Sequence, residues 1–151
     1  MKKTEPIVFK PVGIIHTPFK DDKKKIPRQG RFGEGNEGYA EIFPEYAEGL
    51  KDTEGFSHLY FIFHFHQSDG YSLLQYTPRN HNLRGVFAIR SPRRPNAIGQ
   101  TIVKVNKVEG NKIYFSGADM IDGTPLLDIK PYVPEIDMYP DALNGWLKKE
   151  E

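Results

Sequence analysis

Short apolar runs separated by turn residues are the feature that most restricts how this chain can fold. The runs are rich in β-branched and aromatic residues and are bounded by glycine, proline, asparagine or aspartate, a pattern typical of strands. We expect strands within 8–15, 39–43, 59–65, 85–90, 101–108, 112–116 and 125–132. The connection Glu109-Gly110-Asn111 predicts a hairpin, because its glycine can adopt the positive φ that tight turns require.

Helical signals are few and short. One short helix is expected within 44–52, and another after Pro140, where Asp141 would cap it and Trp146 and Leu147 would anchor it. Many strands with few helices favour a closed or nearly closed barrel, because closure removes exposed sheet edges. The sequence therefore predicts a mainly β domain.

Length and composition restrict the functional class. A chain of 151 residues can bury the core of one domain without disulfides, and it contains no cysteine. Thiolate nucleophiles and cysteine zinc sites are therefore excluded. With no apolar leader and no run of about 18 apolar residues, we expect a cytoplasmic protein with no membrane partner. Because 21 basic residues face 20 acidic ones, any site for a polyanion must be local.

A cationic loop follows the predicted strand at 85–90. It contains Arg90, Arg93 and Arg94 together with Pro92 and Pro95. The prolines fix their own φ angles and bias the preceding residues toward extended backbone, so little conformational entropy is lost when the loop binds an anion. We interpret the loop as a preformed binding edge; the alternative is a surface turn whose arginines are only solvated.

Two connections, 17–37 and 66–84, are longer than a scaffold requires, and loops of this length are usually functional or disordered. We expect both to gather with 91–99 around one pocket. The first carries a lysine run that includes Lys24 and Lys25. This run is either a solvated, mobile tip or a contact for phosphate groups.

Strand alternation in 59–66 predicts three phenylalanines on one face, and His64 and His66 on the other. Two imidazoles on one face suit a metal, but zinc needs three or four ligands and no further partner is evident nearby. We therefore expect no metal. His66 is the better functional candidate, because it stands at the strand end beside Gln67, where pockets open.

The turn Asp122-Gly123 is a second candidate site, because it exposes backbone groups to a ligand. An ordinary hairpin turn explains it equally well. Asp128 and Lys130 are expected on one face as a surface pair. The sequence lacks the phosphate-binding loop, the glycine-rich dinucleotide fingerprint and the nucleophile elbow, so nucleotide hydrolases, Rossmann enzymes and serine esterases are not indicated.

Several ordered motifs together resemble the TsaA-like (TrmO-like) family over nearly the whole chain. They lie at 13–19, 27–29, 55–59, 65–67, 85–92, 94–99 and 122–132, and include Phe65-His66-Gln67, Arg94-Pro95-Asn96 and Asp122-Gly123-Thr124-Pro125. The resemblance implies a single-sheeted antiparallel β-barrel that binds S-adenosylmethionine as a homodimer. It also implies methylation of the exocyclic amine of threonylcarbamoyladenosine beside the tRNA anticodon.

The resemblance also implies site residues by motif position. The expected cofactor contacts are Pro27, Arg28, Gln29, His66, Gln67, Arg90, Gln100, Ile121, Asp122, Gly123 and Thr124. Lys24, Lys25, Arg93 and Arg94 are the expected RNA contacts. Ile89 stands where the family usually has threonine, and Ala97 where it usually has proline. Many bacterial members continue into a second, C-terminal domain, so we expect this chain to be a short, single-domain form.

The expected chemistry needs little beyond positioning. A sulfonium methyl donor is already activated, so the protein must chiefly hold donor and acceptor in line. An amine conjugated to a purine and a carbamoyl group is a poor nucleophile, and His66 and Asp122 are the candidate proton acceptors. The main alternative is a non-catalytic module that holds nucleic acid or a phosphorylated metabolite with Arg90, Arg93 and Arg94; a metal-dependent hydrolase is a more distant one.

Overall fold

The computed structural model describes residues 3–20, 26–27, 35–78 and 81–147. Its strands are β1 (Gly13–His16), β2 (Glu37–Ile42), β3 (His58–His64), β4 (Leu74–Tyr76), β5 (Leu83–Gly85), β6 (Ile98–Glu109), β7 (Lys112–Ser116) and β8 (Thr124–Pro131). Its helical turns are η3 (Pro44–Leu50), η4 (Val86–Ala88), α1 (Pro134–Asp137) and η5 (Gly145–Leu147). Within this part of the chain, no helix combines the length and apolar character needed to cross a bilayer.

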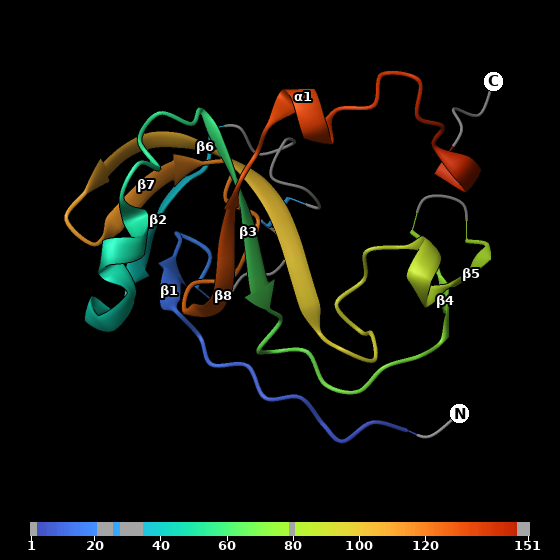
Figure 1. Cartoon of the computed structure of the whole chain (residues 1–151). Helices are drawn as coiled ribbons and strands as arrows, with labels where there is room; N and C mark the ends of the chain where they lie inside the picture. Colours follow the sequence, from blue (N-terminus) through green and yellow to red (C-terminus); the bar gives the residue numbers. More distant parts are fainter. Residues whose placement is uncertain (1–2, 21–25, 28–34, 79–80, 148–151) are drawn as a thin grey trace.

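Six of these strands close into one antiparallel barrel in the order β1-β2-β7-β6-β3-β8, with β8 returning to β1 (Figure 1). β4 and β5 form a separate two-stranded sheet beside the barrel. The predicted single-sheeted antiparallel β-barrel with short helices is therefore confirmed, as is the hairpin at Gly110, which joins β6 to β7 and has a φ of 60°.

The core lies inside the barrel and follows strand alternation. Leu59, Phe61 and Phe63 of β3 are buried, while the intervening side chains face outward. Phe61 packs edge-on against Phe115 of β7, with ring centroids 5.0 Å apart. The predicted alternation is confirmed, but β3 ends at His64, so His66 lies beyond the strand.

Two predicted strands differ from the structure. The strand expected at 85–90 is wrong: β5 ends at Gly85, and the 3₁₀ helix η4 follows, where Val86 is buried and Phe87 is 82% exposed. The strand expected at 8–15 begins only at Gly13. Gly13 pairs with Ile42, the last residue of β2, so β2 does not continue beside the residues before Gly13; Val12 still donates to the carbonyl of Leu126 and accepts from the amide of Phe43.

The C-terminal segment also differs from expectation. α1 forms upstream of the predicted tail helix, which is reduced to the single turn η5. Trp146 nevertheless anchors the segment, because its Nε1 donates a 2.7 Å hydrogen bond to the carbonyl of Ala88. The guanidinium of Arg84 lies 4.7 Å from the Trp146 ring centroid. The tail thus joins the barrel to the β4–β5 sheet.

Gly99 allows the aromatic core to pack at the start of β6. A Cβ at this position would lie 2.4 Å from Cε2 of Phe63 and 2.7 Å from Cζ of Phe65. We expect Gly99→Ala to lower the free energy of unfolding by about 1–3 kcal/mol, because overpacking forces rings from their rotamers. Urea denaturation measures this, with Gly85→Ala as the control, since a Cβ at Gly85 meets nothing within 4 Å. Equal stability of both variants would contradict the packing described.

Candidate functional site

Most of the predicted site residues lie at one end of the barrel. β3 ends there with His64, which pairs with Ile98 at the start of β6, and Phe63 pairs with Leu126 near the start of β8. The segment after β3, the loop before β6 and the turn before β8 therefore meet at this end (Figure 1). The prediction that the connections 17–37, 66–84 and 91–99 gather around one pocket stays a prediction, because part of 17–37 lies outside the described residues.

The turn from Ile121 to Thr124 is fastened to the end of β1. Its amides at Asp122 and Gly123 donate hydrogen bonds of 2.9 Å to the carbonyls of Phe19 and Ile15. The hydroxyl of Thr124 donates to the Ile121 carbonyl at 2.6 Å, and Gly123 has a φ of 86°. The predicted turn is thus fixed by backbone contacts, which leaves its outer groups preorganised for a ligand.

Asp122 faces the outside of β1. Its Oδ1 accepts a 2.9 Å hydrogen bond from the amide of Thr17 and lies 3.7 Å from Nδ1 of His16. The other ring nitrogen of His16, Nε2, lies 3.6 Å from Oε2 of Glu41. The carboxylate of Asp122 therefore helps to hold the turn in place. Its role as a proton acceptor stays a prediction.

Sequence reasoning missed His16 as a site residue. The side chain is about one-third exposed and stacks on Tyr39 with ring centroids 4.6 Å apart. The available signal was its place in the 13–19 motif, immediately before Thr17, whose amide contacts Asp122.

The cationic loop is held by hydrogen bonds within the loop and by hydrogen bonds from the connection that follows β3. Nη1 of Arg94 donates to the carbonyls of Ile89 and Ser91, at 3.0 and 3.2 Å. The hydroxyl of Ser68 donates to the carbonyl of Pro92, and the side-chain amide of Gln75 donates to the carbonyl of Arg93. These contacts support the interpretation of a preformed edge. RNA contacts by Arg93 and Arg94 stay predictions.

The remaining predicted residues are placed as follows. His66 and Gln67 are exposed in the turn after β3, where the amide of His66 donates to the carbonyl of His64 at 2.9 Å. Gln100 is exposed on the outer face of β6, opposite Ile62. Arg90 is exposed at the start of the cationic loop, and Pro27 is half-buried. Arg28, Gln29, Lys24 and Lys25 lie outside the described residues.

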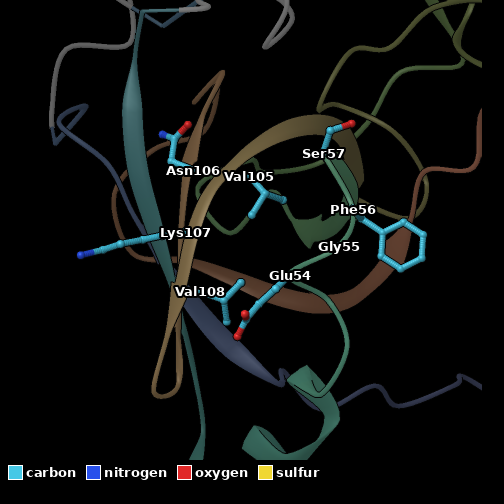
Figure 2. A pocket seen from close by; sticks show the side chains of 8 residues that line it. All are labelled: Glu54, Gly55, Phe56, Ser57, Val105, Asn106, Lys107 and Val108. Atoms are coloured by element: carbon cyan, nitrogen blue, oxygen red, sulfur yellow. The ribbon is translucent and has the colours of Figure 1, made fainter.

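Two surface cavities lie near the opposite end of β3. The first, of about 420 Å³, lies between 54–57 and 105–108 (Figure 2). The second, of about 370 Å³, lies between η3 and the barrel. Neither is lined by a predicted cofactor residue. In the described residues, no three histidine, aspartate or glutamate side chains are grouped to bind a metal ion.

We expect the backbone of the Ile121–Thr124 turn to require glycine. Gly123 has a positive φ, and a Cβ there would meet no neighbouring atom, so Gly123→Ala introduces backbone strain alone. That strain costs about 1–2 kcal/mol, which corresponds to a fall in Tm of about 2–8 °C at this chain length. Thermal unfolding monitored by circular dichroism measures it. Gly55→Ala, at an open position without positive φ, should leave Tm nearly unchanged.

The fold and the placement of the motifs define a single-sheet β-barrel with several loops and the hydrogen-bonded Ile121–Thr124 turn assembled at one end. Residues 14–138 match the tRNA-methyltransferase O N-terminal domain. The chain belongs to this family.

The chain is similar to proteins from all three domains of life. It is 47% identical over 143 residues to a probable S-adenosyl-L-methionine-binding protein of Pyrococcus abyssi, covering 95% of this chain and 77% of that protein. It is 41% identical to human tRNA (adenine(37)-N6)-methyltransferase, covering 89% of this chain and 32% of the enzyme. The crystal structure of TrmO from Pseudomonas aeruginosa superposes with a TM-score of 0.81 at 38% identity, covering 97% and 65% of the two chains.

Proposed function

We propose that this protein is an S-adenosylmethionine-dependent tRNA methyltransferase whose barrel holds the cofactor. The observation that carries the proposal is the meeting of the 65–67 motif, the cationic loop and the Ile121–Thr124 turn at one barrel end. Family membership supports it, since relatives are named for S-adenosylmethionine binding and for N6-methylation of tRNA adenine 37. We propose the exocyclic amine of threonylcarbamoyladenosine beside the anticodon as the acceptor.

The polar groups at this end fit the cofactor. Arg90 offers a guanidinium for the carboxylate of its methionine moiety, since arginine binds carboxylates with a fork of donors. Gln67 and Gln100 offer amides that can both donate and accept, as an adenine edge or a ribose requires. The bound cofactor supplies a methyl group already activated on a sulfonium sulfur. The chain's residues orient the acceptor amine in line with that methyl.

The transfer breaks the sulfur–methyl bond, forms a nitrogen–methyl bond and releases one proton from the acceptor amine. His66 and Asp122 are the candidate acceptors of that proton. Oδ1 of Asp122 accepts a hydrogen bond from the Thr17 amide, and His66 is exposed just beyond β3, so we keep both as candidates for that proton.

A non-catalytic module that holds nucleic acid or a phosphorylated metabolite on the cationic loop is the alternative function. Arg93 at the exposed rim of that loop is the observation in its favour. Isothermal titration with S-adenosylmethionine and with its demethylated product separates the two functions, because only the methyltransferase must bind both.

Replacing Arg90 should affect cofactor affinity selectively. Loss of a charge-assisted hydrogen bond costs about 1.5–3 kcal/mol, so Arg90→Ala should raise the Kd for S-adenosylmethionine about tenfold or more. Arg93→Ala, in the same loop, is the matched control and should leave that Kd unchanged. Titration calorimetry measures both. Equal weakening in the two variants would remove the assignment of Arg90.

Substitution of Lys24 or Lys25 should lower tRNA affinity without changing cofactor affinity. Lys24→Ala and Lys25→Ala are expected to weaken tRNA binding and to flatten its dependence on salt, because each phosphate contact releases counterions. Their cofactor affinity should stay at the level of the unmodified protein. A filter-binding series in increasing KCl tests this, and an unchanged salt slope would place the RNA contact elsewhere.

We also propose that the protein is a homodimer, assembled through the β4–β5 sheet. A two-stranded sheet is marginal by itself, and this one and its flanks expose apolar side chains by about half or more: Tyr71, Leu73, Leu74, Tyr76, Leu83 and Phe87. Exposed apolar groups in such number mark an interaction surface. A tRNA substrate would place the dimer in the cytoplasm.

A charged residue in this surface should dissociate the dimer. Phe87 is 82% exposed within one chain, so Phe87→Asp should leave the fold of the protomer intact while placing a charge in the interface. Analytical ultracentrifugation should show a dimer before the substitution and a monomer after it. A monomeric unmodified protein at micromolar concentration would contradict the proposal.

A further inference from the structure

A row of aromatic rings crosses the outer face of the barrel. His16, Tyr39, Tyr114 and Lys107 are direct register partners on β1, β2, β7 and β6. The ring centroids of His16 and Tyr39 are 4.6 Å apart, and those of Tyr39 and Tyr114 are 5.7 Å apart. We call the three rings the aromatic row. Because the neighbouring strand residues are buried in the core, the row lies on the solvent side of the sheet.

Two lysines lie on the rings of the aromatic row. Nζ of Lys107 is 4.7 Å from the Tyr114 centroid, and Nζ of Lys112 is 5.2 Å from the Tyr39 centroid. Nζ of Lys107 also lies 2.9 Å from Oε2 of Glu109, and the hydrogen bond that it donates to this carboxylate raises the pKa of Lys107. Carboxylates line the same face, because Glu37 and Glu41 alternate with Tyr39 on β2 and Asp122 lies beside His16.

The aromatic row is continuous with the candidate site. At one end, His16 lies 3.7 Å from Asp122. At the other end, Lys107 stands at the rim of the first cavity, and Figure 2 shows its ammonium directed away from that cavity. An extended ligand that runs from the candidate site along this face would therefore contact aromatic rings and ammonium groups in succession.

We propose that the aromatic row binds a single-stranded stretch of RNA next to the methylated nucleotide, with bases stacked on Tyr39 and Tyr114. The proposal rests on the function proposed above. Lys107 and Lys112 move from the rings to phosphate groups as the bases enter. The exchange is favourable, because base stacking on an aromatic side chain raises affinity about 5- to 150-fold, whereas an exposed ammonium over a ring contributes about 2- to 5-fold.

The carboxylates on this face distinguish its binding from that of a basic patch. Stacking on aromatic rings does not itself release counterions, so the salt slope of this face comes from the phosphate contacts of Lys107 and Lys112 and not from the rings. Substitutions in the aromatic row should therefore lower RNA affinity while leaving the salt slope nearly unchanged.

The test is fluorescence anisotropy with a labelled anticodon stem-loop RNA and the full chain. Tyr39→Leu and Tyr114→Leu should each raise the Kd at least fivefold. Tyr132→Leu is the matched control, because Tyr132 and Tyr60 form a tyrosine pair with the same 5.7 Å spacing elsewhere on the barrel; its Kd should be unchanged. Circular dichroism confirms folding. If a leucine variant unfolds, Lys107→Ala with Lys112→Ala takes its place, and the Kd should rise about twofold or more because two exposed ammonium–phosphate contacts are lost.

Two results would overturn the proposal. One is an equal Kd for the two row variants and the Tyr132 control. The other is no binding of the stem-loop by the unmodified protein while calorimetry shows normal S-adenosylmethionine binding. The second result would leave the proposed cofactor site standing, whereas absence of cofactor binding with normal RNA binding would count against the proposed function alone.

Discussion

Pairing of β1 with β8 is the interaction on which the rest of the structure depends. β1 is short, yet it closes the barrel between β2 and β8 through Gly13, Ile14 and Ile15. The same chain segment continues into Thr17, whose hydroxyl donates a 2.8 Å hydrogen bond to the carbonyl of Met120. Closure of the sheet therefore also places the Ile121–Thr124 turn, since the amides of Asp122 and Gly123 donate to carbonyls of β1 and of the segment that follows it.

This arrangement explains how one barrel end can present several distant motifs together. Antiparallel pairing brings the end of β3 and the beginnings of β6 and β8 to the same rim. Hydrogen bonds from Ser68 and Gln75 then hold the cationic loop against its neighbours. The outer faces of β1, β2 and β7 lie side by side next to this rim. His16, the first ring of the aromatic row, therefore contacts Asp122 on one side and Tyr39 on the other.

Much of the barrel could be predicted from the sequence, because strand alternation and turn residues are local signals. The buried phenylalanines of β3 and the hairpin at Gly110 are examples. The β4–β5 sheet could not be predicted, because its strands are only three residues long and their apolar side chains are exposed, whereas Gln75 and Arg84 are partly buried. The contact of Trp146 with Ala88 joins residues 58 positions apart and has no local signature. His16 acquires its neighbours Asp122 and Glu41 only through barrel closure.

The central claim, that the cofactor binds where the 65–67 motif, the cationic loop and the Ile121–Thr124 turn meet, is tested most directly by amide chemical shifts during titration with S-adenosylhomocysteine. The account predicts that the largest shifts occur at 65–68, 90–97 and 121–124. Shifts confined to 54–57 and 105–108, the walls of the first cavity, would contradict it and place the ligand near the opposite end of β3.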